Sequence, residues 1–225
     1  MATYDLEEQE QLAELKAWWK QYGNLVVGVL TAAAIGVIAW QGWNWYQHNQ
    51  TGQASTVYNV LQKSVLDKDS QRIKAASGEL LEKFGSTTYA PLGALSAAKA
   101  MFDAGDVKTA KVQLAWVVEH GKDEFRDLAR LRLAAVLLDE KTYDEALKQL
   151  DGSFNVAFAV RFAENRGDIF KAMGKPTEAR SAYQVALAKL DEAGSKGNNS
   201  LQSKQANGPY REMLQQKYDS LGESK

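Results

Sequence analysis

Residues 166–187 read RGDIFKAMGKPTEARSAYQVAL, and this run predicts two helices joined by a tight turn. Gly174 falls between the two apolar segments, where glycine adopts a positive φ at little cost. Pro176 fits the first turn of the second helix, where no amide donor is needed. The small Ala179 lets the second helix approach its partner, and the larger Tyr183 follows four positions later. The segment therefore predicts a helix–turn–helix hairpin.

The same pattern recurs along the chain. Four alanines, separated by 35, 36 and 33 residues, mark it at Ala75, Ala110, Ala146 and Ala179. That period is close to the roughly 34 residues of a tetratricopeptide repeat, whose unit is a helix–turn–helix. One hairpin cannot bury its own apolar stripe, whereas several stacked hairpins form a continuous core. We therefore predict an all-α fold with a tetratricopeptide-like array, in which residues 54–84 form a divergent first hairpin.

Several local signals refine this array. Thr142 and Glu145 have the spacing of a capping box. Residues 191–208 are rich in Gly, Ser and Asn and predict a linker-like stretch, and residues 209–221 predict a C-terminal helix that caps the array. Large apolar side chains at helical spacing are the core candidates: Phe102, Trp116, Leu131, Leu133, Leu137, Phe162 and Phe170.

A different signal lies near the N-terminus. The 42 residues 21–62 contain no Lys, Arg, Asp or Glu, in a chain that is 24% charged. Within them, residues 25–40 read LVVGVLTAAAIGVIAW. A helix from Tyr22 to Trp43 would be roughly 33 Å long, enough to cross a hydrocarbon core of about 30 Å. We predict one transmembrane helix within residues 22–46; the alternative is a buried core helix of a soluble protein.

Aromatic and basic residues around this segment suggest how it is held. Five tryptophans flank it as candidate interfacial anchors in contact with lipid: Trp18, Trp19, Trp40, Trp43 and Trp45. Lys16 and Lys20 precede it, and no basic residue follows until Lys63. This bias predicts type II topology, with residues 1–21 in the cytoplasm and residues 47–225 across the membrane. Bulky Trp40, Trp43 and Trp45 stand where a cleavage site would need small residues, so we expect an uncleaved signal anchor.

A stripe of small residues lies on the predicted membrane helix, at Gly28, Ala32 and Gly36. Such a stripe permits close packing against another membrane helix, although Gly and Ala are also common in membrane helices in general.

The composition argues against several classes of function. There is no cysteine, and His48 and His120 are the only histidines, which excludes disulfide scaffolds, thiol nucleophiles and multi-histidine metal centres. The near-neutral charge, 27 basic against 28 acidic residues, argues against a nucleic-acid-binding protein. No phosphate-binding loop or zinc-protease motif occurs. We expect no catalytic residue, metal or cofactor, and interpret the chain as a binding protein rather than an enzyme.

The chain as a whole resembles the YfgM family, the ancillary subunits of the bacterial SecYEG translocon. The resemblance rests on the lead-in at residues 15–24, the repeat segments at residues 128–151 and 164–187, and the C-terminal MLQQKYDSL at residues 213–221. It implies an inner-membrane protein with a periplasmic repeat domain. The implied partners are the SecYEG translocon, the periplasmic chaperone PpiD and nascent or unfolded secreted polypeptides, which such proteins help to pass to periplasmic chaperones.

A partner is expected on the concave surface of the array, built by first helices such as residues 127–138 and 156–172. Arg130, Arg161 and Arg166 are the candidate partner-binding residues, with ordinary solvent exposure as the alternative. Two other functions stay open: a structural repeat scaffold of another envelope assembly, and a non-catalytic subunit of an envelope enzyme complex.

Overall fold

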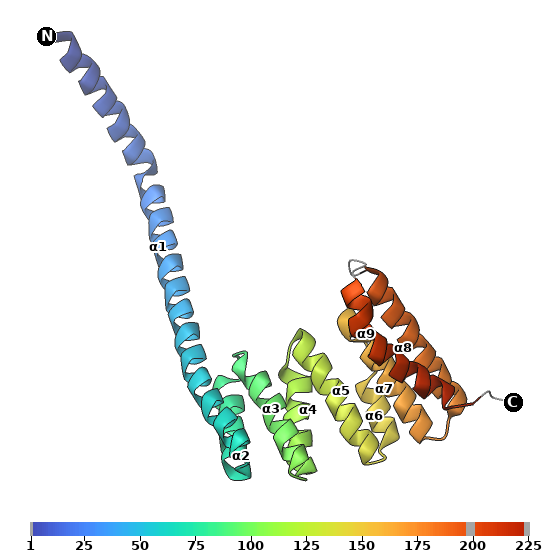
Figure 1. Ribbon diagram of the computed structural model, residues 1–225. Coiled ribbons are helices and arrows are strands. Elements are labelled where there is room, and N and C mark those ends of the chain that lie inside the picture. Colours follow the sequence, from blue (N-terminus) through green and yellow to red (C-terminus); the bar gives the residue numbers. More distant parts are fainter. Residues whose placement is uncertain (1, 197–200, 223–225) are drawn as a thin grey trace. The chain divides into compact units, whose positions relative to one another are not determined.

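The computed structural model describes residues 2–196 and 201–222, and every regular element in these ranges is helical (Figure 1). The predicted all-α fold is confirmed. The chain divides into two units, residues 1–52 and 53–225, and the first helix contributes to both. The elements are α1 (Ala2–Leu66), α2 (Ser70–Phe84), α3 (Tyr89–Asp103), α4 (Val107–His120), α5 (Asp123–Asp139), α6 (Tyr143–Gln149), the 3₁₀ turn η1 (Val156–Phe158), α7 (Ala159–Ala172), α8 (Pro176–Lys196) and α9 (Leu201–Asp219).

The first unit contains the apolar part of α1. Leu25, Leu30 and Ile38 are 65%, 62% and 69% exposed, although a core helix of a soluble protein would bury such side chains. The Thr31 hydroxyl donates to the Val27 carbonyl at 2.8 Å, so this polar group is satisfied within the helix. Within Gln11–Leu66, α1 is long and apolar enough to cross a membrane. The predicted membrane helix is therefore confirmed as a candidate.

Residues 48–53 read HNQTGQ, a polar run that predicts a connection after the membrane helix, but α1 continues through them to Leu66. The segment is polar, but it contains no proline, and Gly52 alone costs a helix only about 1 kcal/mol. Beyond it, Ala54 and Leu61 are fully buried against the next helix. Tertiary packing thus favours the helix over the loop that the local composition suggested.

Four helical hairpins follow one another in the second unit (Figure 1): the end of α1 with α2, α3 with α4, α5 with α6, and α7 with α8. The turns between their two helices have the same backbone conformation. In each turn one residue has a positive φ: Lys68, Gly105, Lys141 and Gly174, at 55°, 81°, 61° and 71°. The next amide in each turn donates to the carbonyl five residues before it, as Asp106 does to Met101 at 2.8 Å. This is the Schellman closure of a helix. The recurring turn confirms the repeat, including its divergent first hairpin.

These turns correct the register predicted for that first hairpin. Ala110, Ala146 and Ala179 each lie five residues after the positive-φ residue and are fully buried. The equivalent position after Lys68 is Ile73, which is 2% exposed, whereas Ala75 is exposed. The register predicted for the first hairpin is therefore wrong by two residues. Ile73 occupies the position at which the other hairpins have alanine, so the alanine pattern selected Ala75 instead.

The core runs from one hairpin to the next in three clusters. The first joins the end of α1 to α2, α3 and α4, the second joins α3 through α7, and the third joins α7, α8 and α9. Leu131, Leu133, Leu137 and Phe162 are buried as predicted. Trp116 and Phe170 are only half-buried, and Phe102 is 38% exposed, so it does not belong to the core.

Gly167 explains the close contact of α7 with α8. A Cβ at this position would lie 2.5 Å from Cε1 of Tyr183. A residue without a side chain is thus needed at position 167, because the ring of buried Tyr183 occupies the space of a Cβ.

Thr142 does not form the predicted capping box with Glu145. Thr142 stands at the N-cap of α6, but its hydroxyl donates to the Leu137 carbonyl at 3.0 Å and does not cap the helix. The hydroxyl instead closes the end of α5, because the Schellman turn brings that carbonyl within its reach.

The linker predicted at residues 191–208 is helical where it is described. α8 continues to Lys196, and α9 begins at Leu201 instead of Pro209. Residues 197–200 lie outside the described ranges. Leu190 is 7% exposed and Leu214 is fully buried in the third cluster, so packing on either side favours helix over the weak propensity of Gly and Ser. Both helices therefore extend into the predicted linker.

Candidate polypeptide-binding surfaces

Two neighbouring hollows lie along the first helices of the hairpins. One has a volume of about 450 Å³ between α3 and α5, and the other, of about 350 Å³, also reaches Val65. Lys99, Asp103 and Arg132 line both. Phe102 lines the larger hollow, which accounts for its exposure. We call these two cavities together the inner hollow; it combines an apolar floor with a few charged groups, as ligand-binding sites do.

Arg132 is the charged residue of this surface that the sequence analysis missed. Its Nη1 donates to the Leu95 carbonyl at 3.2 Å, and partial burial lowers the pKa of its guanidinium. On α5, Arg130 is the arginine predicted from the sequence to bind a partner. Residues two apart on a helix point in nearly opposite directions. Choosing between these two arginines therefore requires knowing which face of α5 lines the hollow.

Arg130 is not a surface residue, which corrects its assignment as a candidate partner-binding group. It is 8% exposed, and its guanidinium donates to the carbonyls of Gln149, at 2.7 Å, of Ser153, at 2.8 Å, and of Asp151. It also lies 4.9 Å from the centre of the Phe162 ring. Arg130 therefore fixes the chain segment that follows α6.

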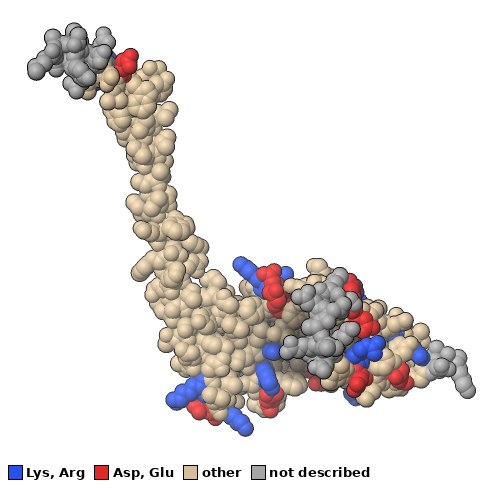
Figure 2. Space-filling view, turned by 45° about the horizontal axis from the view of Figure 1, so that its top comes forward, with Lys and Arg blue, Asp and Glu red and all other residues tan. Residues whose placement is uncertain are grey.

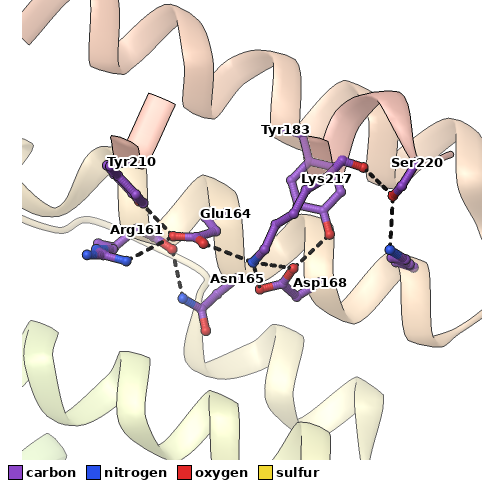
Figure 3. A network of polar contacts seen from close by, with 9 residues as sticks. Arg161, Glu164, Asn165, Asp168, Tyr183, Tyr210, Lys217 and Ser220 are labelled. Atoms are coloured by element: carbon purple, nitrogen blue, oxygen red, sulfur yellow. Dashed lines mark hydrogen bonds and ion pairs between the residues drawn. The ribbon is translucent and has the colours of Figure 1, made fainter. Parts of the chain in front are cut away.

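Arg161 belongs to a polar network that joins α7, α8 and α9 (Figure 3). It pairs with Glu164 at 3.2 Å and lies 4.3 Å from the centre of the Tyr210 ring. Tyr210 donates to Glu164 at 2.6 Å. Lys217 bridges Glu164 and Asp168 at 2.9 and 2.8 Å. These contacts attach α9 to the preceding hairpin.

The network is the one cluster of perturbed titratable groups that the described residues present, so it is the place to look for catalysis. Burial opposes ionisation of Glu164, but hydrogen bonds from Tyr210 and Lys217 outweigh it and hold its pKa below the ordinary value. Burial favours neutral Lys217, yet its carboxylate partners raise its pKa. Burial and Asp168 raise the pKa of Tyr183. Each shift moves the pKa away from neutrality, whereas a general acid or base needs a pKa near the working pH. The geometry thus favours a structural network.

Arg166 lies at a third concave surface. Its Nη2 donates to the Leu150 carbonyl at 2.9 Å and pairs with Asp151 at 2.8 Å. Its side chain lines a groove of about 750 Å³ between α7 and α8, which we call the α7–α8 groove. The three predicted arginines therefore do not form one site: one is buried, one serves the network and one borders this groove.

In the first unit, the predicted membrane residues lie on an open helix surface. A Cβ at Gly28 or Gly36 would meet no atom within 4 Å. The five predicted interfacial tryptophans are between 47% and 70% exposed. The helix carries no blue or red atoms along residues 21–52 in Figure 2, in keeping with the uncharged sequence. Packing of the small-residue stripe against another helix, and the anchoring of the tryptophans in lipid, stay predictions.

Comparison with known proteins gives this architecture its family. Residues 16–223 match the tetratricopeptide repeat-like domain family. An ancillary SecYEG translocon subunit of Neisseria gonorrhoeae is 33% identical over 223 residues, which cover 96% of this chain and 98% of that protein. The chain belongs to the family of ancillary SecYEG translocon subunits.

Two further members show how far the similarity extends. The ancillary SecYEG translocon subunit of Haemophilus influenzae is 30% identical over 82% of this chain and 90% of its own length. That of Escherichia coli is 30% identical over 80% of this chain and 87% of its own length. The family resemblance drawn from the sequence is confirmed, and the relatives are named for their association with the translocon.

Proposed function

We propose that this protein is a membrane-anchored adapter of the Sec translocon in the bacterial inner membrane. Residues 1–21 lie in the cytoplasm, and the helical hairpins lie in the periplasm. The hairpins bind secreted polypeptides and help to pass them to periplasmic chaperones such as PpiD. The mechanism is binding, and no bond is made or broken.

One observation supports this proposal above the others. A single chain of this translocon-associated family combines an exposed apolar helix long enough to cross a membrane with an array of hairpins that carries open, largely apolar concave surfaces. The anchor keeps the array at high effective concentration beside a membrane partner, so individual contacts with the polypeptide can be weak. Weak contacts suit a protein that must release what it binds.

The inner hollow is the surface that we assign to the passing polypeptide. Phe102 offers an aromatic face, and Lys99 and Arg132 offer donors for carbonyl or carboxylate groups. Arg132 keeps its charge at any physiological pH, because the pKa of a guanidinium lies far above neutrality. Extended or partly folded segments with mixed apolar and charged residues would fit such a surface, because Asp103 and Asp139 line it as well.

Membrane orientation can be tested with single cysteines, since the chain has no cysteine of its own. We expect a membrane-impermeant maleimide to label Lys175→Cys in intact spheroplasts and to leave Ala13→Cys unlabelled until the membrane is opened. Both residues are exposed, so burial cannot explain a difference. The reverse labelling pattern would exclude the periplasmic assignment.

The partners can be tested by photo-cross-linking in native membranes. A photoreactive residue at position 102 should capture SecY, PpiD or a secreted polypeptide during translocation. The matched control is position 112, where a valine is 60% exposed on α4 away from the inner hollow. Recovery of a different envelope assembly from position 102, without SecY or PpiD, would favour the structural scaffold or the enzyme-complex subunit instead.

A further inference from the structure

The two cavities of the inner hollow follow one another along the same pair of helices. The smaller cavity is lined by Leu92 and Phe125, near the starts of α3 and α5, and the larger by Phe102 and Asp139, near their ends. Arg132 lines both cavities and lies midway between Phe125 and Asp139 on α5. These two residues lie 14 positions apart, which is about 21 Å along a helix. An extended polypeptide of about six residues covers that length.

Arg132, at the junction of the cavities, forms an ion pair with none of the described residues. A guanidinium has five N–H donors, and the bond that Arg132 makes is to the Leu95 carbonyl. The side chain is nevertheless half-buried. Two other arginines of the array that are at least half-buried, Arg130 and Arg166, each pair with an aspartate, at 3.3 and 2.8 Å. A half-buried cation with unused donors on the wall of a cavity favours an anionic group inside it.

The two aspartates that line the hollow do not neutralise Arg132. Asp103 pairs with Lys99 at 2.7 Å, so these two residues together add little net charge. Asp139 is exposed at the outer end of the larger cavity, seven residues beyond Arg132 and about 10 Å away along α5. Exposed charges at that separation are largely screened at physiological salt, where the Debye length is about 8 Å. Arg132 therefore determines the charge at the middle of the hollow.

Apolar side chains are accessible on each side of Arg132. Phe125 and Leu128 are half-buried in the smaller cavity, and Phe102 and Ala135 are exposed in the larger one. In an extended chain every second side chain lies on the same side, at intervals of about 7 Å. When one side chain contacts Arg132, the side chains two positions before and two positions after it therefore lie over the two cavities.

We propose that the inner hollow selects extended segments of secreted polypeptides in which an acidic residue has an apolar residue two positions before it and another two positions after it. The carboxylate pairs with Arg132, and one apolar side chain enters each cavity. A guanidinium binds a carboxylate through two parallel charge-assisted hydrogen bonds, so a neutral amide at the same position is a poorer ligand. The inference rests on the proposed function for the statement that polypeptides enter the hollow, and it adds which sequences the hollow prefers.

The probe is a fluorescently labelled peptide of seven residues with blocked ends, which has a central aspartate, a leucine two positions away on either side and serine elsewhere. One control has asparagine in place of the aspartate, and the other has both leucines moved next to the aspartate. The full-length protein in lipid nanodiscs, where no detergent competes for the apolar cavities, should bind the probe saturably and each control about tenfold more weakly.

Each of the other outcomes contradicts the proposal. Equal binding of the asparagine peptide would exclude recognition of the charge, and equal binding of the rearranged peptide would exclude the spacing. If none of the peptides bound, the site itself would be excluded. If light scattering showed a peptide-free dimer that Arg132→Met dissociates, the occupant would be a second copy of the chain and the proposal would fail.

Variants then assign the preference to Arg132. Arg132→Met and Arg132→Gln both remove the charge, so each should bind the aspartate and asparagine peptides equally. Two neutral variants are used so that one remains informative if circular dichroism shows that the other is unstable. Arg126→Met is the matched control, because Arg126 also lies on α5 and donates to one carbonyl, that of Gly121 at 3.0 Å, but lines neither cavity. It should keep the tenfold preference. An unchanged preference in a folded neutral variant of Arg132 would overturn the assignment.

Photo-cross-linking locates the bound peptide. A diazirine analogue in place of one leucine should label α3 and α5 around one cavity, and the analogue in place of the other leucine should label them around the second cavity. Labelling confined to other helices would contradict the site. Equal binding of all three peptides would reject the preference and leave the adapter function intact. Failure to capture SecY, PpiD or a secreted polypeptide from position 102 would reject that function without altering the peptide preference, so the two proposals can fail separately.

Discussion

Lys68 and Lys141 occupy turn positions that glycine fills in the other two hairpins. Their φ values, 55° and 61°, lie in the left-handed region, where a side chain is strained by about 1 kcal/mol or more. The carbonyls of the closing turn are nevertheless satisfied, because the Schellman hydrogen bonds form as they do at Gly105 and Gly174. The strain lies in the backbone of the single turn residue. A glycine at that position would relieve it and keep the hydrogen bonds of the turn.

We therefore expect Lys141→Gly to stabilise the hairpin array by about 0.5–1 kcal/mol, after the greater backbone entropy of glycine in the unfolded chain is deducted. Thermal melting of the full-length protein in detergent, followed by circular dichroism, measures the effect. Lys148→Gly, at an exposed position inside α6, should instead lose about 1 kcal/mol of helix propensity. A lower melting temperature for Lys141→Gly would show that the lysine side chain contributes more than its backbone costs.

Gly167 tests the packing of α7 on α8. Gly167→Ala would place a methyl group 2.5 Å from a ring carbon of fully buried Tyr183, so we expect a loss of about 1–3 kcal/mol. Gly78→Ala in α2 is the control, because its Cβ would meet nothing within 4 Å and should stabilise the helix slightly. The same melting experiment compares them, and equal stability of the two variants would contradict the close contact.

At the scale of elements, α9 is attached by the charged network as well as by apolar burial. Leu214 is the fully buried apolar residue of the described part of α9, and Lys217 is the cation that bridges Glu164 and Asp168. Glu164 is 5% exposed, so removal of Lys217 would leave a buried carboxylate that keeps Tyr210 and Arg161 but loses its lysine partner. We expect Lys217→Met to cost about 2–3 kcal/mol, less than a fully buried pair because Lys217 retains some solvent. Exposed Lys148→Met should change little.

The same network predicts how the attachment of α9 depends on pH. The pKa of Glu164 is lowered from 4.5 in the folded protein, so its contribution is complete above that pH and is lost as the pH falls through the lowered value. The pKa of Lys217 is raised from 10.5, so its contribution is complete below that pH and is lost as the pH rises through the raised value. The protection of the α9 amides, that is, their hydrogen exchange corrected for the intrinsic pH dependence of amide exchange, should be greatest between these limits. In Lys217→Met this dependence should shrink, and an unchanged profile would contradict the role of the network.

The elements also show what the sequence could predict and what it could not. The period of the buried alanines predicted the hairpins, because a small residue is required wherever two helices approach closely. It failed at Ile73, where the first hairpin uses a larger side chain at the same position. The residues around Gln149 do not by themselves predict that α6 ends there. The helix ends early because Arg130, on another helix, donates hydrogen bonds to the carbonyls of Gln149 and Ser153. Arg132 and Arg130 were confused for a similar reason, because their phase on α5 depends on where that helix packs.

At the scale of the whole molecule, the proposed function requires that the apolar part of α1 enter a membrane. Leu30 lies within it and is 62% exposed, so it has no role in packing the hairpins. Leu30→Arg should disfavour insertion by about 3–4 kcal/mol, the cost of the arginine together with the lost leucine. Alkaline extraction of membranes should then release more of the protein than it does for Val112→Arg, which carries the same charge on α4. Equal release of the two variants would argue against this segment as the anchor.

The segment after α6 and the helix α9 are both held beside α7, but by different chemical groups. This difference has a consequence for acid stress. The segment after α6 is tied by a guanidinium to three neutral carbonyls, and these bonds keep their protonation in any cell; one carboxylate, Asp127, adds a hydrogen bond from the amide of Asn155. The helix after α8 is tied through carboxylates, which can be neutralised. As the surroundings of the cell acidify, the array should therefore begin to fray from its C-terminal helix, while the fold around Arg130 persists.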